Sequence, residues 1–469
     1  MNCRTAVILA AGAGTRMKSA KPKVLHEVMG KPMVSHVISQ VRKSGSENII
    51  VVVGHGAHQV KEALSDEGVS FAVQKEQLGT GHAVIQALDQ IPEEGDVFIV
   101  CGDTPLITAE TLGRFAEYHE KSGAELTVLT AEYDDPSGYG RIIRGKDGSL
   151  LRIVEQKDAT EEEKLVKEVN AGMYCVKASF LRESLPKLSN DNAQNEYYIT
   201  DLIAMAAEKG AAAAFCAEDA EEIMGVNNRV QLAAAAKVMR RRINERLMMD
   251  GVTIVDPDTT YIDDTVVIGN DTEIGPDTII KGNTRIGINV TIGGGCLIED
   301  SVIGDDVDIL KSVIKNSSVG SRTNVGPFAY LRPGNDIGED CKVGDFVEFK
   351  NSVFGDGSKA SHLAYIGDAD VGNDCNVGCG VIFANYDGKK KHRTSVGDRV
   401  FIGSNSNLVA PVTVNDDAFI AAGTTVTKEV EEGALSIGRV VDRQEEGWVD
   451  KKDLKREKIH KFHRKKDNK

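Results

Sequence analysis

Two hydrophobic patterns divide the chain into an N-terminal and a C-terminal half. From residue 1 to about 225, short apolar runs alternate with stretches in which apolar residues recur at helical spacing. The apolar runs predict strands at 6–10, 49–53, 97–101, 126–130 and 173–176, and the helical spacing predicts helices at 33–43, 83–88 and 111–120. Buried strands that alternate with amphipathic helices are typical of a mostly parallel, Rossmann-like sheet covered on both faces. We therefore expect an α/β nucleotide-binding domain over residues 1–228.

From residue 251 onward, a six-residue period replaces the helical pattern. Isoleucine occupies consecutive positions of this period, at Ile262, Ile268, Ile274, Ile280, Ile286, Ile292 and Ile298. After a slip the period resumes at Val313, Val319, Val325, Leu331, Ile337, Val343 and Phe349, and with further slips it continues to Val426. A glycine often follows the apolar residue, where a crowded or left-handed backbone would favour it. Since one short strand and one tight corner fit six residues, the pattern predicts a parallel β-helix of stacked three-sided coils over residues 251–469.

The segment between the two patterns, 229–250, is rich in alanine and predicts a connecting helix. Its apolar residues share one helical face and Gly251 follows as a stop signal; the face consists of Leu232, Ala236, Met239, Ile243 and Leu247. The run Arg240-Arg241-Arg242 is expected to be a solvated face of this helix. The last residues, 451–469, carry ten Lys and Arg against three Asp and Glu and predict a mobile basic tail.

The charge of the chain limits the partners it can have. Its 469 residues include 71 Asp and Glu against 56 Lys and Arg, which gives a net charge of -15. This excess disfavours a nucleic-acid or anionic-membrane partner, since such partners select clustered positive charge. No apolar segment reaches the roughly 18 residues of a membrane helix, so we expect no membrane insertion. The eight cysteines are scattered without zinc-type spacing, which favours reduced thiols and a cytoplasmic location.

A glycine-rich segment follows the first predicted strand and favours a phosphate site. It runs Leu9-Ala10-Ala11-Gly12-Ala13-Gly14-Thr15-Arg16-Met17, and Pro22-Lys23 follows. Glycines let a backbone approach phosphate oxygens, while Arg16 and Lys23 offer the positive charge that phosphoryl transfer requires. The segment is neither a Walker loop nor a dinucleotide fingerprint, because it lacks Gly-Lys-Ser/Thr and has Met17 at the third glycine position. A plain turn would explain the glycines alone, but not the added cations.

Asp103 follows the strand predicted at 97–101, at the edge of the sheet where ligands of α/β domains bind. One carboxylate, together with triphosphate oxygens and water, is a common set of ligands for Mg²⁺. Asn227 offers a second, neutral oxygen. The residues therefore predict a Mg²⁺ site, with a turn-forming aspartate as the alternative.

A polar insertion, 385–391, interrupts the six-residue period between Phe383 and Val396. A polar excursion from regular coils is where a solenoid builds a ligand pocket. His362 lies upstream of the insertion. A neutral imidazole is well suited to take a proton from an amine near pH 7, which acetyl transfer from a thioester requires. His362 is thus predicted as a general base, and on the residues alone a structural histidine stays the alternative.

The motifs of the first half resemble the sugar-1-phosphate nucleotidyltransferases, whose signature has the form Gly-x-Gly-Thr-Arg-Met followed by Pro-Lys. Further matching segments extend over essentially the whole chain, at Gln74, 77–83, 102–106, 138–141, Glu155, Asn170, 225–229, 331–334, Lys350, 359–367 and 385–391. The chain as a whole is similar to the family of bacterial bifunctional N-acetylglucosamine-1-phosphate uridyltransferases and glucosamine-1-phosphate N-acetyltransferases. This resemblance also implies that the coils wind left-handed.

For the first half, the resemblance implies a site for UTP, N-acetylglucosamine-1-phosphate and Mg²⁺. It places the UTP phosphates on Leu9, Ala10, Ala11, Gly12 and Lys23, with Arg16 and Lys23 as the catalytic cations. It places uracil on Gln74, Gly79 and Thr80. It places the acetylated sugar on Gly140, Glu155 and Asn170, and it places the metal on Asp103 and Asn227.

For the second half, the resemblance implies acetyl transfer from acetyl-CoA to glucosamine-1-phosphate. The acceptor would be held by Arg332, Lys350, Tyr365, Asn376, Asn385, Tyr386 and Lys391, and acetyl-CoA by Cys379, Ser404, Ala422 and Arg439. Cys379 stands where many relatives have alanine, and we expect it to be a passive packing residue. The family implies a homotrimer with acetyl sites shared between subunits. The combined expectation is a bifunctional enzyme that makes UDP-N-acetylglucosamine, a precursor for peptidoglycan.

Two other interpretations stay open on the sequence. A monofunctional nucleotidyltransferase with a structural β-helix would be expected to have a shorter solenoid, without His362 and the 385–391 insertion together. A non-catalytic sensor of sugar nucleotides would bind without turnover, and it leaves the set of Arg16, Lys23 and Asp103 without a purpose.

Overall fold

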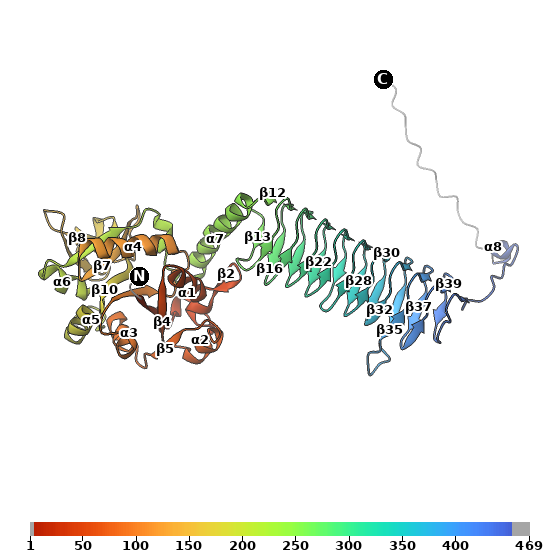
Figure 1. The fold of residues 1–469 in the computed structure, drawn as a ribbon, viewed down its shortest axis with the longest axis horizontal. Helices are drawn as coiled ribbons and strands as arrows, with labels where there is room; N and C mark the ends of the chain where they lie inside the picture. Colours follow the sequence, from red (N-terminus) through yellow and green to blue (C-terminus); the bar gives the residue numbers. More distant parts are fainter. Residues whose placement is uncertain (1–3, 453–469) are drawn as a thin grey trace, which may run out of the picture. The chain divides into compact units, whose positions relative to one another are not determined.

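The computed structural model describes residues 4–452 (Figure 1). It divides into two compact units, Met1–Pro327 and Phe328–Lys469. The division falls within the region of coils predicted from residue 251 onward. Most of the predicted basic tail, 453–469, lies outside the described residues. No helix of the described part is long and apolar enough to cross a membrane.

The first unit begins with a nine-stranded sheet whose main path is β11-β7-β10-β6-β1-β4-β5. These strands are β1 (Arg4–Ala10), β4 (Ser46–Val53), β5 (Ser70–Val73), β6 (Asp96–Cys101), β7 (Leu126–Glu132), β10 (Glu168–Lys177) and β11 (Ala212–Cys216), with β8 (Arg141–Arg144) and β9 (Leu150–Val154) off the path. A separate pair is formed by β2 (Glu27–Val28) and β3 (Lys31–Pro32). β1 is parallel to β4 and β6, whereas β10 is antiparallel to β6 and β7. The mostly parallel sheet is therefore confirmed, with β10 as the reversed strand.

Two hydrophobic cores cover the two faces of this sheet, because successive residues of a strand point to opposite faces. α1 (Met33–Lys43), α2 (Ala57–Ala63) and α4 (Ala109–Ser122) pack with Ile8 on one face. α3 (Thr80–Ile85), α5 (Ala178–Ser184) and α6 (Asp201–Glu208) pack with Val7 on the other. The predicted helix at 83–88 is wrong in position, since the backbone at Gly79 (φ 107°) lets α3 start directly after it.

The predicted connecting helix is α7 (Arg229–Met249), and its first amides are capped by the Asn228 side chain. The prediction of a solvated face for its arginine run is right for Arg241, which is exposed, and wrong for Arg240 and Arg242. Arg240 is only 8% exposed, lies 3.1 Å from Asp258, and places its guanidinium 4.8 Å from the centre of the Tyr261 ring. Arg240 and Arg242 are covered because Asp258 and the Leu106 carbonyl oxygen, from other segments, contact them.

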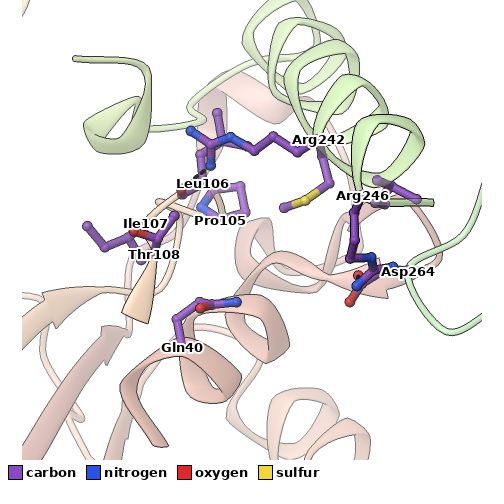
Figure 2. Close-up of a pocket in the computed structure, with 10 residues that line it drawn as sticks. Gln40, Pro105, Leu106, Ile107, Thr108, Arg242, Arg246 and Asp264 are labelled. Carbon is purple, nitrogen blue, oxygen red and sulfur yellow. Dashed lines mark hydrogen bonds and ion pairs between the residues drawn. The ribbon is translucent and has the colours of Figure 1, made fainter. Parts of the chain in front are cut away.

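A small cavity of about 160 Å³ lies where α7 meets the loop after β6. Figure 2 shows Arg242 reaching toward Leu106 and Arg246 toward Asp264. The Arg242 guanidinium donates to the Leu106 carbonyl oxygen at 2.6 Å, and Arg246 lies 3.5 Å from Asp264. None of the predicted site residues lines this cavity. Arg242 joins α7 to the loop after β6, and Arg246 joins it to the first coil, between β13 and β14.

Short strands of the first unit stack in three parallel ladders, β12-β15-β18-β21-β24, β13-β16-β19-β22 and β14-β17-β20-β23. They are β12 (Thr253–Ile254), β13 (Tyr261–Ile262), β14 (Val267–Ile268), β15 (Glu273–Ile274), β16 (Ile279–Lys281), β17 (Arg285–Ile286), β18 (Thr291–Ile292), β19 (Leu297–Glu299), β20 (Val302–Ile303), β21 (Asp308–Ile309), β22 (Val313–Lys315), β23 (Ser318–Val319) and β24 (Asn324–Val325). Three ladders are what a three-sided coil requires, so the predicted parallel β-helix is confirmed.

The predicted isoleucine series forms the core of these coils. Six of its members are buried, and Ile268 is half-buried. The predicted resumption at Val313 is wrong by one residue: Val313 is half-buried, while Ile314 is fully buried. The core series steps by five residues from Ile309 to Ile314 and Val319, so the period shortens at this point.

The second unit contains further coils, with ladders β27-β30-β33-β36-β39-β41, β25-β28-β31-β34-β37-β40 and β26-β29-β32-β35-β38. The strands are β25 (Tyr330–Leu331), β26 (Asp336–Ile337), β27 (Lys342–Asp345), β28 (Glu348–Lys350), β29 (Val353–Phe354), β30 (Lys359–His362), β31 (Tyr365–Gly367), β32 (Ala369–Val371), β33 (Asn376–Val377), β34 (Ile382–Ala384), β35 (Thr394–Val396), β36 (Phe401–Ile402), β37 (Asn407–Val409), β38 (Val412–Val414), β39 (Phe419–Ile420), β40 (Thr425–Val426) and β41 (Leu435–Ser436), followed by the helix α8 (Trp448–Lys451). The polar insertion 385–391 leaves the coils between β34 and β35, as predicted.

Candidate active sites

The glycine-rich loop after β1 and the loop after β5 form one cavity of about 370 Å³. It is lined by Leu9, Ala11, Gly12, Ala13, Gln74, Gln77, Gly79, Thr80, Ala83 and Glu196. β1 and β5 both end at this edge of the sheet, so residues far apart in the sequence meet there. The cavity thus brings together the residues predicted for phosphates and for uracil, except Ala10, which is buried at the end of β1, and Lys23, which does not line it.

The segment that contains Gly79 and Thr80, which are predicted to contact uracil, packs against the backbone around Tyr197. A Cβ atom on Gly79 would lie 2.6 Å from the Tyr197 carbonyl oxygen, so this close approach requires glycine. The Gly81 amide donates to the same oxygen at 2.8 Å, and Thr80 Oγ1 accepts from the Ile199 amide at 3.2 Å. Gln74 is 4% exposed. These contacts present a rigid edge to the cavity.

Four predicted residues converge at the carboxyl end of β6. Lys23 Nζ donates to the Asp103 carboxylate and lies 3.2 Å from Asn227 Oδ1, and Arg16 donates to the same Asn227 oxygen at 2.9 Å. The Asp103 carbonyl oxygen accepts from the Val226 amide at 2.9 Å, which ties the two metal-ligand candidates together. The side chains of Lys23 and Asp103 are each 17% exposed. Two cations that suit a polyphosphate and two oxygen ligands that suit a metal ion are therefore assembled beside the glycine-rich loop.

Asp103 and Asn227 fit a divalent cation such as Mg²⁺. Their oxygens reach the same Lys23 ammonium, so both already face one positive charge. Mg²⁺ prefers oxygen ligands, takes only one or two of them from the protein, and keeps water and phosphate as the rest. In residues 4–452 no group of three or more His, Cys, Asp or Glu is placed to hold a metal ion.

The residues predicted for the sugar form a second, adjoining set. Arg16 and Glu155 line a cavity of about 580 Å³. The Asn170 amide donates to the Gly140 carbonyl oxygen at 2.9 Å, and a Cβ atom on Gly140 would lie 3.5 Å from Glu155 Oε1. Burial raises the pKa of Glu155, and the nearby carboxylates of Asp158, Asp201 and Glu196 raise it further.

Tyr174 was missed by the sequence reasoning. Its buried hydroxyl accepts from Asn170 Nδ2 at 2.9 Å and so fixes the side chain of a residue predicted to contact the sugar. Tyr174 lies in β10 four residues after Asn170, and its sequence carries no signal for this contact beyond that spacing.

In the second unit, His362 forms a pair with Asp345 on the neighbouring coil. His362 Nδ1 lies 2.8 Å from Asp345 Oδ1, and the hydrogen bond from His362 lowers the pKa of Asp345. An aspartate that accepts from Nδ1–H leaves Nε2 of a neutral ring with a free lone pair. The His362 side chain is 61% exposed. It is therefore an accessible base with a fixed orientation.

A second cluster lies around Asp368, another residue that the sequence reasoning missed. Its carboxylate accepts from Lys350 Nζ at 2.9 and 2.8 Å, from Asn351 Nδ2 at 2.8 Å and from Asn385 Nδ2 at 2.6 Å. Burial opposes ionisation of Asp368, but these hydrogen bonds outweigh it and hold the pKa below its usual value. Asn385 Nδ2 also lies 3.3 Å from the Tyr365 hydroxyl. The predicted acceptor residues Lys350, Tyr365 and Asn385 are thus brought together.

Of the other predicted acceptor residues, Lys391 and Arg332 lie near this cluster, whereas Asn376 lies in β33 of another ladder. Lys391 lies close to Lys350, and this neighbouring ammonium lowers the pKa of Lys391. Arg332 lies 3.0 Å from Glu348. Tyr386 bridges to Lys391 across the insertion, and Asn376 pairs with Lys359 in the coil ladder.

The residues predicted for acetyl-CoA lie on later coils. Arg439 donates to the Ala422 carbonyl oxygen at 2.7 Å, and a Cβ atom on Gly378 would lie 2.6 Å from the Ser404 amide. Cys379 is exposed, and its carbonyl oxygen accepts from the Asn405 amide. Within residues 4–452, no hydrogen bond joins these four residues to His362.

Comparison with known proteins identifies similar chains and domains. Residues 6–191 match the family described as MobA-like NTP transferase domain, 257–334 the GMPPB C-terminal domain, and 393–428 the bacterial transferase hexapeptide (six repeats). A curated "Bifunctional protein GlmU" of Clostridioides difficile is 53% identical over 96% of this chain and 98% of its own length. Proteins with the same description from Clostridium acetobutylicum and Caldanaerobacter subterraneus are 52% and 54% identical, over 96% and 95% of this chain and 99% and 97% of their own lengths.

Proposed function

Because the chain belongs to the family of bifunctional GlmU proteins, we propose that its two sites catalyse consecutive steps toward UDP-N-acetylglucosamine. The chain is a nucleotidyltransferase and an acetyltransferase, in keeping with its NTP transferase and hexapeptide domains. In the proposed order, acetyl-CoA acetylates glucosamine-1-phosphate, and the product then reacts with UTP and releases pyrophosphate. The observation that carries this proposal is the convergence of Arg16, Lys23, Asp103 and Asn227 beside the cavity under the glycine-rich loop.

In the uridylyl step, a phosphate oxygen of N-acetylglucosamine-1-phosphate attacks the α-phosphorus of UTP, and the bond to pyrophosphate breaks. Arg16 and Lys23 stabilise the negative charge that develops on the phosphoryl oxygens and on the leaving group. Gly140, Glu155 and Asn170 orient the sugar, and Gln74, Gly79 and Thr80 contact uracil. Bound through Asp103 and Asn227, Mg²⁺ would add charge neutralisation on the phosphates.

In the acetyl step, the amine of glucosamine-1-phosphate attacks the thioester carbonyl, and the bond to the CoA sulfur breaks. His362 Nε2 takes the proton from the amine, while Asp345 holds the other ring nitrogen. Arg332, Lys350 and Lys391 supply the positive charge for the acceptor phosphate. Tyr365, Asn376, Asn385 and Tyr386 orient the sugar, and Cys379, Ser404, Ala422 and Arg439 hold acetyl-CoA.

The assembly and the location of the protein belong to the same proposal. The hexapeptide coils support an oligomer, and we propose a homotrimer in the cytoplasm that shares its acetyl sites between subunits. The functional limits are taken as 1–228 for uridylyl transfer, 229–250 for the connecting helix and 251–469 for acetyl transfer.

The test is mass spectrometry of the nucleotide product formed from glucosamine-1-phosphate, acetyl-CoA, UTP, Mg²⁺ and pyrophosphatase. The expected result is a UDP-N-acetylhexosamine that requires acetyl-CoA. If a UDP-sugar forms only from pre-acetylated sugar phosphate, the coils have a structural role and the proposed acetyl step is wrong.

A further inference from the structure

We infer that His82 is a positioning residue that orients Gln74 and thereby sets the preference of the uridylyl site for uracil over cytosine. The inference rests on the proposed function, since it concerns the base of the nucleotide bound there. His82 lies in α3 and does not line the nucleotide cavity, but its Nδ1 lies 3.1 Å from Gln74 Nε2. Gln74 lines the cavity from a buried position, so the orientation of its carboxamide depends on its protein partners.

Two partners fix which end of the Gln74 carboxamide is the NH₂ group. Nε2 lies 3.0 Å from the Gly79 carbonyl oxygen, which can only accept a hydrogen bond. The second N–H of the same group then points to His82 Nδ1, which accepts it. Both donors of Gln74 are therefore used within the protein, and the carboxamide oxygen Oε1 is the group that remains for a ligand.

His82 can accept this bond only as a neutral ring whose proton is on Nε2. Gln86 Nε2 lies 3.2 Å from that nitrogen and 3.4 Å from the His82 carbonyl oxygen. A half-turn of the Gln86 carboxamide gives up the long 3.4 Å hydrogen bond and brings its oxygen to the ring N–H. The His82 ring also packs beside Tyr197, with 6.3 Å between the ring centres. Gln86, His82 and Gln74 thus form a chain of contacts that ends at the nucleotide cavity.

An oxygen presented to the base selects uracil. N3 of uracil carries a proton and donates to Oε1, whereas N3 of cytosine carries a lone pair that Oε1 repels. Because Gln74 is buried, water is poorly placed to compensate for the mismatch with cytosine. Without His82, one N–H of Gln74 loses its partner, and the carboxamide is freer to turn and donate to cytosine.

The experiment compares the full-length chain with His82→Leu and His82→Asn. For each protein, kcat and KM are measured with UTP and with CTP from pyrophosphate release in the presence of N-acetylglucosamine-1-phosphate. Acetyl transfer, measured as CoA release, shows that each variant is folded. Leucine removes the acceptor at similar size, while the Asn oxygen can accept at the place of Nδ1, so the second variant is the matched control.

In His82→Leu, we expect the ratio of kcat/KM for UTP to that for CTP to fall by about tenfold, mostly through KM for UTP. His82→Asn should keep most of the wild-type ratio. An unchanged ratio in His82→Leu, or an equal fall in both variants, would overturn the inference.

Wild-type turnover separates this inference from the proposed function. If the wild type releases pyrophosphate from UTP and the ratio does not respond to His82→Leu, only the inference fails. If the wild type turns over neither nucleotide, the proposed function fails, and the ratio of UTP and CTP dissociation constants from calorimetry on the same three proteins decides the inference. Absence of binding to either nucleotide would overturn both.

Discussion

Glu155, which we propose orients the sugar, is a residue whose ionisation the fold opposes. Burial and the surrounding carboxylates raise its pKa, so its charged form costs the folded state free energy. The folded chain then binds a proton more tightly than the unfolded chain. Stability therefore falls as the pH rises from the ordinary carboxyl pKa to the raised one, and above the raised pKa the full cost is present.

Glu155→Gln is expected to stabilise the first unit by about 0.5–2 kcal/mol at pH 7.5, because it removes this charged form. The gain should shrink as the pH falls through the raised pKa and vanish below the ordinary pKa. Denaturant unfolding at pH 4 and at pH 7.5 measures the difference, and kcat/KM for the sugar phosphate should fall. An equal stability change at both pH values would contradict the assigned cause.

Single residues show where sequence reasoning succeeds and where it stops. Lys23, Asp103 and Asn227 lie in loops far apart in the chain, and the resemblance predicted their joint site. Asp368 was missed, although its partner Lys350 is 18 positions away and Asn385 is 17 positions away. His362 and Asp345 are likewise 17 positions apart. Residues 17 or 18 positions apart stack on adjacent coils. The length of one coil is therefore the sequence signal from which these contacts can be predicted.

Among the elements, the coils depend on glycines at points of close contact between adjacent turns. Gly344 lies in β27 directly before Asp345, and a Cβ atom there would lie 1.9 Å from the Ser361 carbonyl oxygen. The Ser361 carbonyl group is part of the backbone, so it cannot move away from a Cβ atom as the end of a flexible side chain could. The requirement for glycine at position 344 is thus steric, since no left-handed φ is involved there.

Gly344→Ala is expected to destabilise the second unit by about 2–4 kcal/mol and to reduce acetyl transfer, because it displaces the coil that carries Asp345. Gly113→Ala is the matched control: Gly113 lies inside α4 with no atom near its would-be Cβ, and alanine there should stabilise by about 0.5–1 kcal/mol. Denaturant unfolding and CoA release test both. Similar effects of the two substitutions would contradict the steric explanation.

The elements were predictable to the extent that their residues alternate or repeat. The helix predicted at 33–43 coincides with α1, and the isoleucine period predicted the coils. The slip near Val313 was placed wrongly because Val313 and Ile314 are equally apolar, and only packing decides which one enters the core. Arg240 and Arg242 of α7 were misjudged for a related reason: their partners Asp258 and Leu106 belong to other segments.

For the whole molecule, the two proposed activities use separate sets of residues. Asp103→Asn removes a charged oxygen ligand and should lower uridylyl transfer by at least about 100-fold while acetyl transfer persists. His362→Ala should do the reverse. An equal mixture of the two variants should again convert glucosamine-1-phosphate to UDP-N-acetylglucosamine, as measured by mass spectrometry. If either variant loses both activities, or the mixture stays inactive, the sites are not independent.

The stacking of the coils has a consequence for how the chain reaches its fold. Within each unit, a coil strand pairs only with strands one turn away, as Tyr261 pairs with Ile279 and Tyr330 with Glu348. Most turns therefore close a loop of similar length, 18 positions from Tyr261 to Ile279 and 16 from Leu297 to Val313, and lose a similar amount of chain entropy. The turn that contains the 385–391 insertion is longer, with 25 positions from Asp370 to Ser395. The sheet around β1 instead joins Thr5 to Asn48 and Val97, which demands the closure of long and unequal loops. The coils can form by propagation from a first turn, because each turn pairs with the one before it. The sheet instead requires strands that are distant in the sequence to pair before any of them is stable.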